Sequence, residues 1–437
     1  MKASYFNFFI NDHPEKGQVL ILNTRTQAIA VFEKELADIL QNNSGKVIDL
    51  DENKFSELLE EGFCIKDDIC EKDILESWFH EICYKQKNIT ATILTTYNCN
   101  FACPYCFEGS ATNKPENMTK KTMNNICKWL FTKAIDINAK SINIFFYGGE
   151  PLLNKEIIDN ISPRIYSFCK HKGITFKFGI VTNGYLIKKQ DSDYWKTYGL
   201  DFYRITLDGS KTWHNKTRPL KGNMPTFQTI VNNIRSNTSG VKVLISGNYT
   251  KETSTGFYEL IEYLSKSDIK EKIHSLSFTP VIKTLASSCR SEHGLCEVNN
   301  DVELNQIYLD IKKFYKKHGF KDSRKNISMQ TCPFKINDTN ITMTPDGCIY
   351  KCPATIGHKE FSVGNVKEIH LNDKNKEIIT SDLWKECYPC VYLPICSGGC
   401  YYSSYVKEGH FPAIDCQKTF IEKSLTNDLK EEYASSI

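Results

Sequence analysis

Eighteen cysteines, unevenly spaced along the chain, are the feature that most constrains the structure of this protein. Three lie between Cys99 and Cys106, and eight lie between Cys332 and Cys416. Clustered cysteines form disulfides in small secreted proteins, but in a large intracellular enzyme they bind metal or do chemistry. The first residues contain only a short apolar stretch, broken by Asn7, and no signal-peptide cleavage site. We therefore expect a cytoplasmic protein whose cysteine clusters hold metal.

The composition of the chain argues against nucleic-acid and membrane partners. The 437 residues are 41% hydrophobic and 24% charged, as in globular proteins of two or three domains. The 55 basic and 52 acidic residues leave a formal net charge of +3, which gives no electrostatic basis for binding nucleic acid. No run of about 18 apolar residues occurs, so no membrane-spanning helix is expected.

Residues 1–87 have the pattern of a small separate domain. Two strand-like runs, Tyr5–Ile10 and Val19–Val31, come first. Two helical stretches, Glu33–Gln41 and Lys54–Glu61, follow them. This size and order predict a winged-helix-like domain. The alternative is an extension that only packs on the rest of the enzyme.

From about residue 89, short apolar runs alternate with amphipathic helical stretches. Six strand–helix units in this order predict a parallel sheet rolled into a full or partial barrel, with its reactive site at the carboxyl ends of the strands. From about Ser328 the alternation stops, and bound metal is expected to stabilise this segment. The predicted strands are Ala91–Thr96, Ile142–Tyr147, Thr175–Val181, Tyr203–Leu207, Val241–Ser246 and Leu276–Val281, and the predicted helices are Thr119–Ala134, Lys155–Lys170, Phe227–Ser236, Gly256–Ser265 and Asp301–Lys317.

The loop after the first predicted barrel strand contains Cys99, Cys103 and Cys106. Three thiolates in one short loop can bind three corners of an iron–sulfur cube and leave its fourth iron open, and thiolate is the ligand that such clusters require. A three-cysteine zinc site is the alternative. The position of the loop at the mouth of a predicted barrel favours the iron–sulfur cluster.

The next strand ends carry polar and glycine-rich motifs. Gly148-Gly149-Glu150-Pro151 ends the second strand, and paired glycines let a backbone approach a ligand closely, while Glu150 suits an ammonium group. Turn residues are the alternative explanation for each of these motifs. The third strand ends in Thr182-Asn183-Gly184, and the fourth ends in Asp208-Gly209 with His214 and Arg218 shortly after. Asn248, at the end of the fifth strand, is a weaker candidate for a site residue.

Seven of the eight cysteines from Cys332 onward follow a fixed spacing. A zinc ribbon would account for Cys387 and Cys390 with one later pair, but not for all seven. The pattern is Cys332, 14 residues, Gly347, four residues and Cys352, and then Cys387, Cys390, Cys396, Cys400 and Cys416.

These motifs resemble those of a known family over residues from about 89 to 420. The spacing Cys-x3-Cys-x2-Cys, with Tyr105 before the last cysteine, resembles the radical S-adenosylmethionine (SAM) superfamily, and Gly-Gly-Glu-Pro is similar to its SAM-binding element. The seven later cysteines resemble the SPASM domain of radical SAM peptide and protein modifiers. The resemblance implies an α/β fold: a partial (β/α)6 radical SAM barrel over 88–325, a SPASM domain over 326–437, and a winged-helix-like domain over 1–87.

The resemblance also implies three [4Fe–4S] clusters and bound SAM. The first cluster would be held by Cys99, Cys103 and Cys106, and an electron donor such as flavodoxin or ferredoxin would reduce it. An electron from this cluster would cleave SAM to a 5′-deoxyadenosyl radical, which takes a hydrogen atom from the substrate. The residues expected to bind SAM are Tyr105, Gly148, Gly149, Glu150, Thr182, Asn183, Asp208 and Arg218, where Arg218 would pair with the SAM carboxylate.

The other two clusters would be auxiliary ones held by the SPASM cysteines. One would use Cys332, Cys352 and Cys400, with either Cys348 as fourth ligand or an iron left open. The other would use Cys387, Cys390, Cys396 and Cys416. The seven remaining cysteines are Cys64, Cys70, Cys83, Cys127, Cys169, Cys289 and Cys296. Most of them are expected to be small buried apolar residues. Cys289 and Cys296 follow the sixth strand and would approach the barrel mouth.

Three functions fit this reading of the chain. The favoured one is a maturase that crosslinks a ribosomally made precursor peptide, for example through a Cys thioether, because such enzymes carry an N-terminal domain that binds the peptide's leader as an added strand. The second is a sulfatase-maturing enzyme or another SPASM protein or cofactor maturase. Sulfatase-maturing enzymes carry an Asp after the auxiliary-cluster cysteine, where this chain has Pro353. The third is a non-catalytic iron–sulfur carrier or scaffold, which needs neither the open cluster nor the Gly-Gly-Glu-Pro element.

Overall fold

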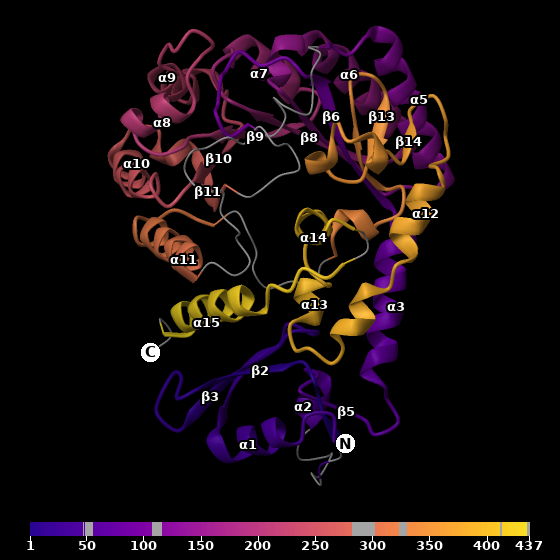
Figure 1. Cartoon of the computed structure of the whole chain (residues 1–437), viewed down its shortest axis with the longest axis vertical. Helices are drawn as coiled ribbons and strands as arrows, with labels where there is room; N and C mark the ends of the chain where they lie inside the picture. The colour runs from indigo at the N-terminus through magenta and orange to yellow at the C-terminus, as the bar shows by residue number, and fades with distance from the viewer. Residues whose placement is uncertain are drawn as a thin grey trace. The chain divides into compact units, whose positions relative to one another are not determined.

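The computed structural model describes residues 1–46, 48, 56–106, 116–281, 302–322, 329, 331–410 and 413–434 (Figure 1). Backbone contacts divide the chain into two compact units, each built from separate segments. The terminal unit contains residues 1–85, 325–335 and 380–437, and the sheet unit contains residues 86–324 and 336–379. The division into three domains at residues 87 and 325 stays a prediction.

The sheet unit is built on one nine-stranded sheet in the order β11-β10-β9-β8-β7-β6-β12-β13-β14. Neighbouring strands from β6 to β11 are parallel, which confirms the predicted α/β fold with a parallel sheet. All six predicted barrel strands are present, with ends shifted by a few residues. They are β6 (Asn88–Thr96), β7 (Ser141–Gly148), β8 (Thr175–Thr182), β9 (Leu200–Thr206), β10 (Lys242–Tyr249) and β11 (Ile273–Pro280).

Helices follow the strands and lie in an arc along their outer side (Figure 1). Local signals fix their ends: the side chain of Thr119 caps α5 by accepting from the backbone N–H of Thr122 at 3.1 Å, and Gly173 ends α6 with a left-handed φ of 67°. The helices are α5 (Lys120–Asp136), α6 (Lys155–Lys172), α7 (Lys189–Lys196), α8 (Lys211–Thr217), α9 (Phe227–Asn237), α10 (Thr255–Lys266), α11 (Val302–Lys317) and α12 (Asp373–Thr380).

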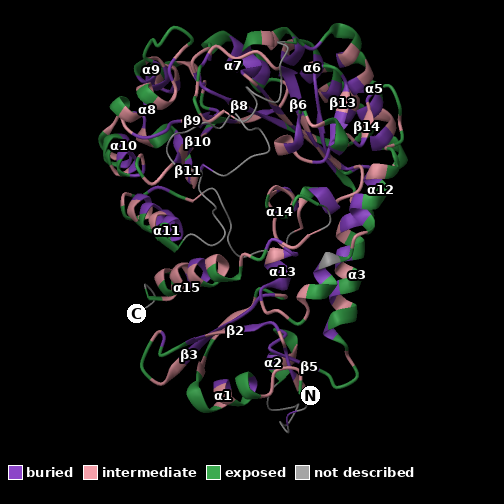
Figure 2. Cartoon of the chain, viewed as in Figure 1, coloured by how far each residue is buried: buried purple, intermediate pink, exposed green. Residues whose placement is uncertain are grey.

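The core of the sheet unit lies along the strands, which Figure 2 shows as largely buried. In β7, residues alternate strictly between buried and half-buried, and Ile142, Ile144 and Phe146 are fully buried. This alternation places one face of the strand in the core and directs the other face to the opposite side of the sheet. The strand ends are thereby fixed, so the polar residues that follow them have defined positions.

Three short strands from the cysteine-rich segment extend the sheet, which the sequence did not predict. They are β12 (Asn340–Met343), β13 (Cys348–Tyr350) and β14 (Gly364–Asn365), and β12 pairs in parallel with β6. Ile341 and Met343 are buried there. Runs of two to four residues are too short for hydrophobic alternation to be recognised. Pairing with β6 brings β12 into the sheet, β13 pairs with β12, and β14 pairs with β13.

The terminal unit begins with two small sheets. Strands β2 (Asn7–Asn11), β3 (Gln18–Asn23) and β4 (Ile29–Glu33) form an antiparallel sheet with β3 in the centre, and β1 (Lys2–Ala3) pairs with β5 (Cys64–Ile65). The predicted single strand Val19–Val31 is therefore wrong. Asn23 accepts backbone hydrogen bonds from Arg25 and Thr26 and closes a turn between β3 and β4.

Helices complete the terminal unit, and β3 separates two cores within it. Val19 and Ile21 pack with Ala37 and Leu40 of α1, whereas Leu20 and Leu22 pack with Tyr392, Ile395, Leu425 and Leu429 from the C-terminal segment. Both ends of the chain thus share one hydrophobic core. The helices are α1 (Lys34–Asn42), α2 (Ser56–Glu60), α3 (Glu71–Tyr84), α13 (Leu393–Cys396), α14 (Tyr401–Glu408) and α15 (Lys418–Ala434).

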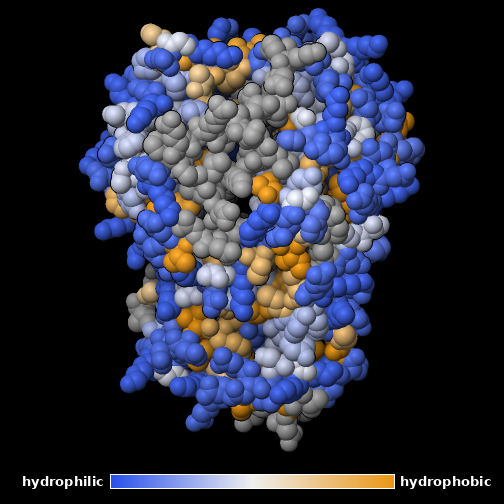
Figure 3. Space-filling view, viewed as in Figure 1, coloured by the Kyte–Doolittle hydropathy of each residue, from blue (hydrophilic) through white to orange (hydrophobic). Residues whose placement is uncertain are grey.

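None of the helices in the described ranges combines the length and the apolar character needed to cross a membrane. The face of the molecule drawn in Figure 3 is mostly hydrophilic, in keeping with the 24% of charged residues.

Candidate active site

The three-cysteine loop follows β6 directly and is fixed by backbone hydrogen bonds at both sides. The N–H of Ala102 donates to the carbonyl of Pro219 at 2.9 Å, and the N–H of Lys221 donates to the carbonyl of Asn100 at 2.9 Å. The N–H of Phe101 donates to the sulfur of Cys99 at 3.4 Å. The loop is therefore held against the segment that follows α8, at the carboxyl ends of the strands.

The thiols of this loop lie close enough to influence one another. The pKa of Cys99 is raised to about 12, chiefly by burial, and Glu150, Cys103 and Cys106 contribute to the rise while the hydrogen bond from the N–H of Phe101 opposes it. Burial also raises the pKa of Cys103 to about 11, an effect that the guanidinium of Arg218 opposes. Half-buried thiols with raised pKa values become thiolates only beside strong positive charge, which bound iron provides. In the described part of the chain, no group of three His, Cys, Asp or Glu side chains is placed to hold a single metal ion.

The two glycines at the end of β7 pack against the start of the cysteine loop. The N–H of Gly149 donates to the carbonyl of Thr96 at 3.1 Å, and the N–H of Glu150 donates to the carbonyl of Asn98 at 2.8 Å. A Cβ at Gly148, whose φ is +127°, would lie 2.3 Å from the carbonyl oxygen of Thr96, and a Cβ at Gly149 would lie 2.4 Å from that of Asn98. Glycine is required here because two backbones meet without room for a side chain.

Glu150 is fully buried and accepts three hydrogen bonds. Its Oε1 accepts from the N–H of Leu152, where it caps η1 (Pro151–Asn154), and from the hydroxyl of Thr182 at 2.7 Å. Its Oε2 accepts from the N–H of Asn183 at 2.8 Å. Burial raises the pKa of Glu150 to about 6, while these donors lower it. Glu150 is therefore ionised at neutral pH and keeps acceptor capacity on Oε2 for a cationic group.

A second buried carboxylate, Asp208, joins Tyr105 and Arg218 at the end of β9. The hydroxyl of Tyr105 contacts Asp208, and Nη1 of Arg218 donates to the same hydroxyl at 2.6 Å. Nη1 of Arg218 lies 3.8 Å from Oδ2 of Asp208, and Oδ1 accepts from the N–H of Asn248 at 2.8 Å. Burial raises the pKa of Asp208, and Arg218 opposes that shift. Among the described atoms, the Nε of Arg218 is buried without a hydrogen-bond partner, so it remains available to an anionic group.

His214 holds the backbone of Asp208 in place. Its Nδ1 accepts from the backbone N–H of Asp208 at 3.1 Å, and the ring is completely buried. Burial, followed by the charge of Arg218, lowers the pKa of His214 well below its ordinary value. The ring is therefore neutral with its proton on Nε2, and it fixes the backbone that carries the Asp208 carboxylate.

Side chains at the end of β8 complete the site. The hydroxyl of Thr182 donates a hydrogen bond to Glu150, and Nδ2 of Asn183 donates one to the side chain of Asn100 in the cysteine loop at 2.8 Å. The sequence-predicted residues of β6 to β9 are thus brought together at one edge of the sheet. Sequence reasoning missed Asn98 and Asn100, whose polar type alone gives no sign of these contacts.

Residues 93–264 match the Radical SAM superfamily. The chain therefore contains a radical SAM domain. The match begins in β6 and ends in α10, so it includes the cysteine loop, Glu150, Asp208 and Arg218.

Two relatives extend the similarity beyond this domain. The cysteine-type anaerobic sulfatase-maturating enzyme of Clostridium novyi is 25% identical over 361 residues, covering 75% of this chain and 93% of the relative. The radical SAM cyclopropyl synthase TigE of Paramaledivibacter caminithermalis is 23% identical over 353 residues, covering 74% and 70%. The similarity to these two relatives therefore extends well beyond the part of the chain that matches the radical SAM model.

Solved structures show the same fold at low sequence identity. The protein anSMEcpe with bound AdoMet aligns with a TM-score of 0.61 at 17% identity, covering 80% of this chain and 100% of that one. Streptococcus suis SuiB bound to the precursor peptide SuiA aligns with a TM-score of 0.54 at 17% identity, covering 95% and 98%.

The later cysteines fall into both compact units. Cys348 begins β13, and Cys352 precedes η4 (Pro353–Thr355), both in the sheet unit. The other six lie in the terminal unit. The pKa values of Cys387 and Cys396 are raised to about 11 each, chiefly by burial, and the nearby thiols of Cys390 and Cys416 contribute to both increases. All four thiols predicted to share one auxiliary cluster are therefore neighbours.

The remaining cysteines are mostly buried, as expected for small apolar residues. Cys64, Cys83, Cys127 and Cys169 are at most 4% exposed. Cys70, which directly precedes α3, is exposed. Cys289 and Cys296 lie outside the described residues.

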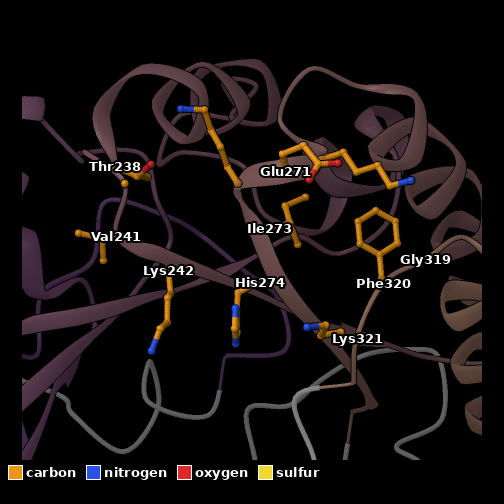
Figure 4. A pocket seen from close by; sticks show the side chains of 12 residues that line it. Thr238, Val241, Lys242, Glu271, Ile273, His274, Gly319, Phe320 and Lys321 are labelled. Atoms are coloured by element: carbon orange, nitrogen blue, oxygen red, sulfur yellow. The ribbon is translucent and has the colours of Figure 1, made fainter.

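A hollow of about 430 Å³ in the sheet unit lies away from the radical SAM site (Figure 4). Lys242 and Ile273, which line it, are the first residues of β10 and β11, so the hollow opens at the amino ends of these strands. Lys321 and His274 line it as well, and Lys242 pairs with Asp201 at 3.3 Å. Sites on parallel strands lie at the carboxyl ends, so this hollow is not part of the active site.

Proposed function

We propose that this protein is a radical SAM peptide maturase that abstracts a hydrogen atom from a ribosomally made precursor peptide and installs an oxidative crosslink, such as a Cys thioether. The observation that carries the proposal is the three-cysteine loop held between Gly149-Glu150 and the Tyr105–Asp208–Arg218 group. When bound, a [4Fe–4S] cluster and SAM would supply the electron and the 5′-deoxyadenosyl radical for this chemistry.

The residues of the chain would bind and orient these groups. Cys99, Cys103 and Cys106 would hold the cluster, and flavodoxin or ferredoxin would supply its electron. Glu150, ionised at neutral pH, would accept the ammonium group of SAM. Arg218 would bind the SAM carboxylate through its unpaired Nε, since its Nη1 is already engaged with Tyr105.

The terminal unit supports a peptide as the substrate. Strands β2 and β4 are the outer strands of its three-stranded sheet, and Val31 of β4 is 39% exposed. An extended leader peptide can add to such an edge through backbone hydrogen bonds. The solved structure of SuiB, which is bound to a precursor peptide, aligns with 95% of this chain, whereas anSMEcpe aligns with 80%. Slower hydrogen exchange in β4 on adding the precursor peptide would test this docking edge.

The SPASM cysteines would hold two auxiliary clusters that accept the second electron of the oxidation. Cys387, Cys390, Cys396 and Cys416 would hold one, in keeping with their mutual proximity. The other would use Cys332, Cys352 and Cys400. Three [4Fe–4S] clusters correspond to about twelve irons per chain.

Sulfatase maturation is the second candidate, because the Clostridium novyi relative with that name covers 75% of this chain. Pro353 follows Cys352 where sulfatase-maturing enzymes resembling this chain carry an Asp. The N-terminal strands and helices of the terminal unit also favour a peptide maturase. A sulfatase-derived cysteine peptide converted to formylglycine would reverse this preference.

The decisive experiment measures 5′-deoxyadenosine and iron on the same anaerobically reconstituted, reduced protein. The wild type should cleave SAM with about twelve irons bound, and a variant with Cys99, Cys103 and Cys106 changed to Ala should not cleave SAM and should keep about eight. A fully loaded wild type that leaves SAM intact, with and without precursor peptide, would contradict the proposal and favour an iron–sulfur carrier or scaffold.

A further inference from the structure

The hollow at the amino ends of β10 and β11 is built by three segments of the sheet unit (Figure 4). One segment lies between α9 and β10, one lies between α10 and β11, and one follows α11. The volume of the hollow, about 430 Å³, falls within the range of about 300–1,000 Å³ that is typical of small-molecule sites. The hollow has no part in the function proposed above, so its side chains need a separate explanation.

The buried part of the lining is apolar. It consists of Val241, Ile273 and Phe320, which are at most 8% exposed and are called the apolar floor below. Val241 directly precedes β10, and Ile273 begins β11, so the strands fix the positions of both side chains. Burial of apolar surface is favourable, so such a floor suits the carbon skeleton of an organic ligand better than a bare inorganic ion.

The more exposed part of the lining is basic. Among the described residues that line the hollow, four are lysines and one, Glu271, is a carboxylate. Figure 4 shows Lys242 and His274 extending side by side from β10 and β11, with Lys321 next to them on the segment after α11. The whole chain has a formal net charge of only +3, so the hollow holds a local excess of positive charge. The lysines are Lys242, Lys270, Lys272 and Lys321.

Carboxylates of the protein neutralise only part of this charge. Lys242 lies 3.3 Å from Asp201, but Asp201 is shared with a second lysine, from β8, at 3.4 Å. Lys272 and Lys321 are both exposed, and neither ammonium group forms a hydrogen bond or an ion pair with any residue that the structure describes. At least two cations of the lining are therefore available to an anion.

Lys270 connects the basic lysines with the apolar floor. Its side chain is half-buried, and its Nζ lies 5.9 Å from the centre of the Phe320 ring. The same Nζ would lie 3.8 Å from a Cβ at Gly319, which is also part of the lining. A ligand that touches both parts of the hollow therefore carries its negative groups next to its carbon skeleton.

The chemistry of the ligand follows from these two parts. Ammonium groups gathered around one hollow repel one another, and a multiply charged anion offsets that repulsion. Lysine binds phosphate as a compact point charge. We propose that the hollow binds a small molecule that joins two or more phosphate groups to a ring, such as a nucleoside diphosphate. The phosphate groups contact Lys272 and Lys321, and the ring lies on the apolar floor. This site is separate from the radical SAM site and does not depend on the proposed function.

The test measures equilibrium binding of ADP to the full, anaerobically reconstituted chain at physiological salt. SAM is present in excess, so that binding of nucleotide at the carboxyl ends of the strands is suppressed. A Lys272→Gln/Lys321→Gln variant is compared with Lys170→Gln/Lys172→Gln, a pair that is exposed on α6 and changes the net charge equally. The wild type and the α6 variant should bind one ADP per chain, and the hollow variant should bind it roughly tenfold more weakly or worse, because two charge-assisted contacts are lost.

Pyrophosphate is the second probe, because it has the phosphate groups of ADP without the ring. It should compete with ADP and bind more weakly, and equal affinity for the two would overturn the assigned ligand class. Hydrogen exchange locates the site: ADP should slow exchange in residues 238–242, 270–274 and 319–321. Slower exchange only at the carboxyl ends of the strands, binding that does not saturate, or equal weakening in the two double variants would each overturn the proposal.

Discussion

Glu150 shows how the site balances burial against hydrogen bonding at the scale of one residue. Burial raises the pKa of its carboxyl group, whereas three donors from Leu152, Thr182 and Asn183 lower it, and the pKa is about 6. The side chain is therefore a fixed negative charge under physiological conditions. Its position is set before any ligand arrives, because all three donors belong to the protein.

A Glu150→Gln change should weaken SAM binding by roughly tenfold to a hundredfold, since a hydrogen bond to a charged group contributes about 1.5–3 kcal/mol. In the proposed site only the ionised form would bind the ammonium group, so wild-type affinity should rise as pH rises through about 6. The variant should lack this rise. Equilibrium binding of SAM to the unreduced, cluster-loaded protein on both sides of that pH measures the effect.

Glu156→Gln is the matched control, because Glu156 is 62% exposed and only pairs with Lys120 at the surface. Its SAM affinity should equal that of the wild type. Equal binding by Glu150→Gln and Glu156→Gln would show that Glu150 is purely structural.

Cys83 marks the limit of residue-level prediction from the sequence. The Cys-x3-Cys-x2-Cys loop is predictable because all its ligands lie in one short segment. Cys83 follows Leu75 and Phe79 at intervals of four residues, which is the pattern of a buried helix face. A core position and a metal ligand look the same in that pattern, so the sequence predicts the burial of Cys83 and nothing more about it.

At the scale of elements, the contact between β7 and the cysteine loop determines the geometry of the site. A Gly149→Ala change would place Cβ 2.4 Å from the carbonyl oxygen of Asn98 and 2.6 Å from that of Tyr97. The loop must move, so iron should fall from about twelve to about eight per chain and SAM cleavage should be lost. Iron analysis and a 5′-deoxyadenosine assay measure both.

Gly173→Ala provides the control for backbone strain. Gly173 has a positive φ of +67°, which Gly149 does not have, but a Cβ at Gly173 would meet open space. It should cost about 1–2 kcal/mol of stability and leave the iron content unchanged. Normal iron in Gly149→Ala would mean that the loop accommodates a side chain there.

The elements themselves were largely predictable, because the six barrel strands have strong apolar runs. The turn between β3 and β4 was missed because apolar residues continue on both sides of it, from Val19 to Leu22 and from Ala28 to Val31. Strand β12 was missed because its pairing with β6 depends on residues about 250 positions away, as Asn340 opposite Thr90 shows, and β13 and β14 only extend the sheet from β12. Local sequence carries no record of such contacts.

At the scale of the whole molecule, the sequence suggested an N-terminal domain separate from the cysteine-rich segment, but the chain ends share one core. Leu20 and Leu22 pack with Leu425 and Leu429, and Cys390 and Cys396 border that core. The sheet proposed to bind a leader peptide therefore shares a core with two cysteines proposed to hold an auxiliary cluster. Peptide docking and cluster stability should respond to the same substitutions.

A Leu22→Ala change tests this coupling against a closely matched control. Leu22 and Ile21 are both fully buried neighbours in β3, but Ile21 faces Ala37 and Leu40 of α1. Each substitution should cost about 2–5 kcal/mol of stability. Only Leu22→Ala should also lower auxiliary-cluster iron and speed hydrogen exchange in α13 and α15, because its cavity opens beside Cys390 and Cys396. Equal iron loss in both variants would mean that the terminal unit unfolds as a whole, without a specific link between the sheet and the cluster.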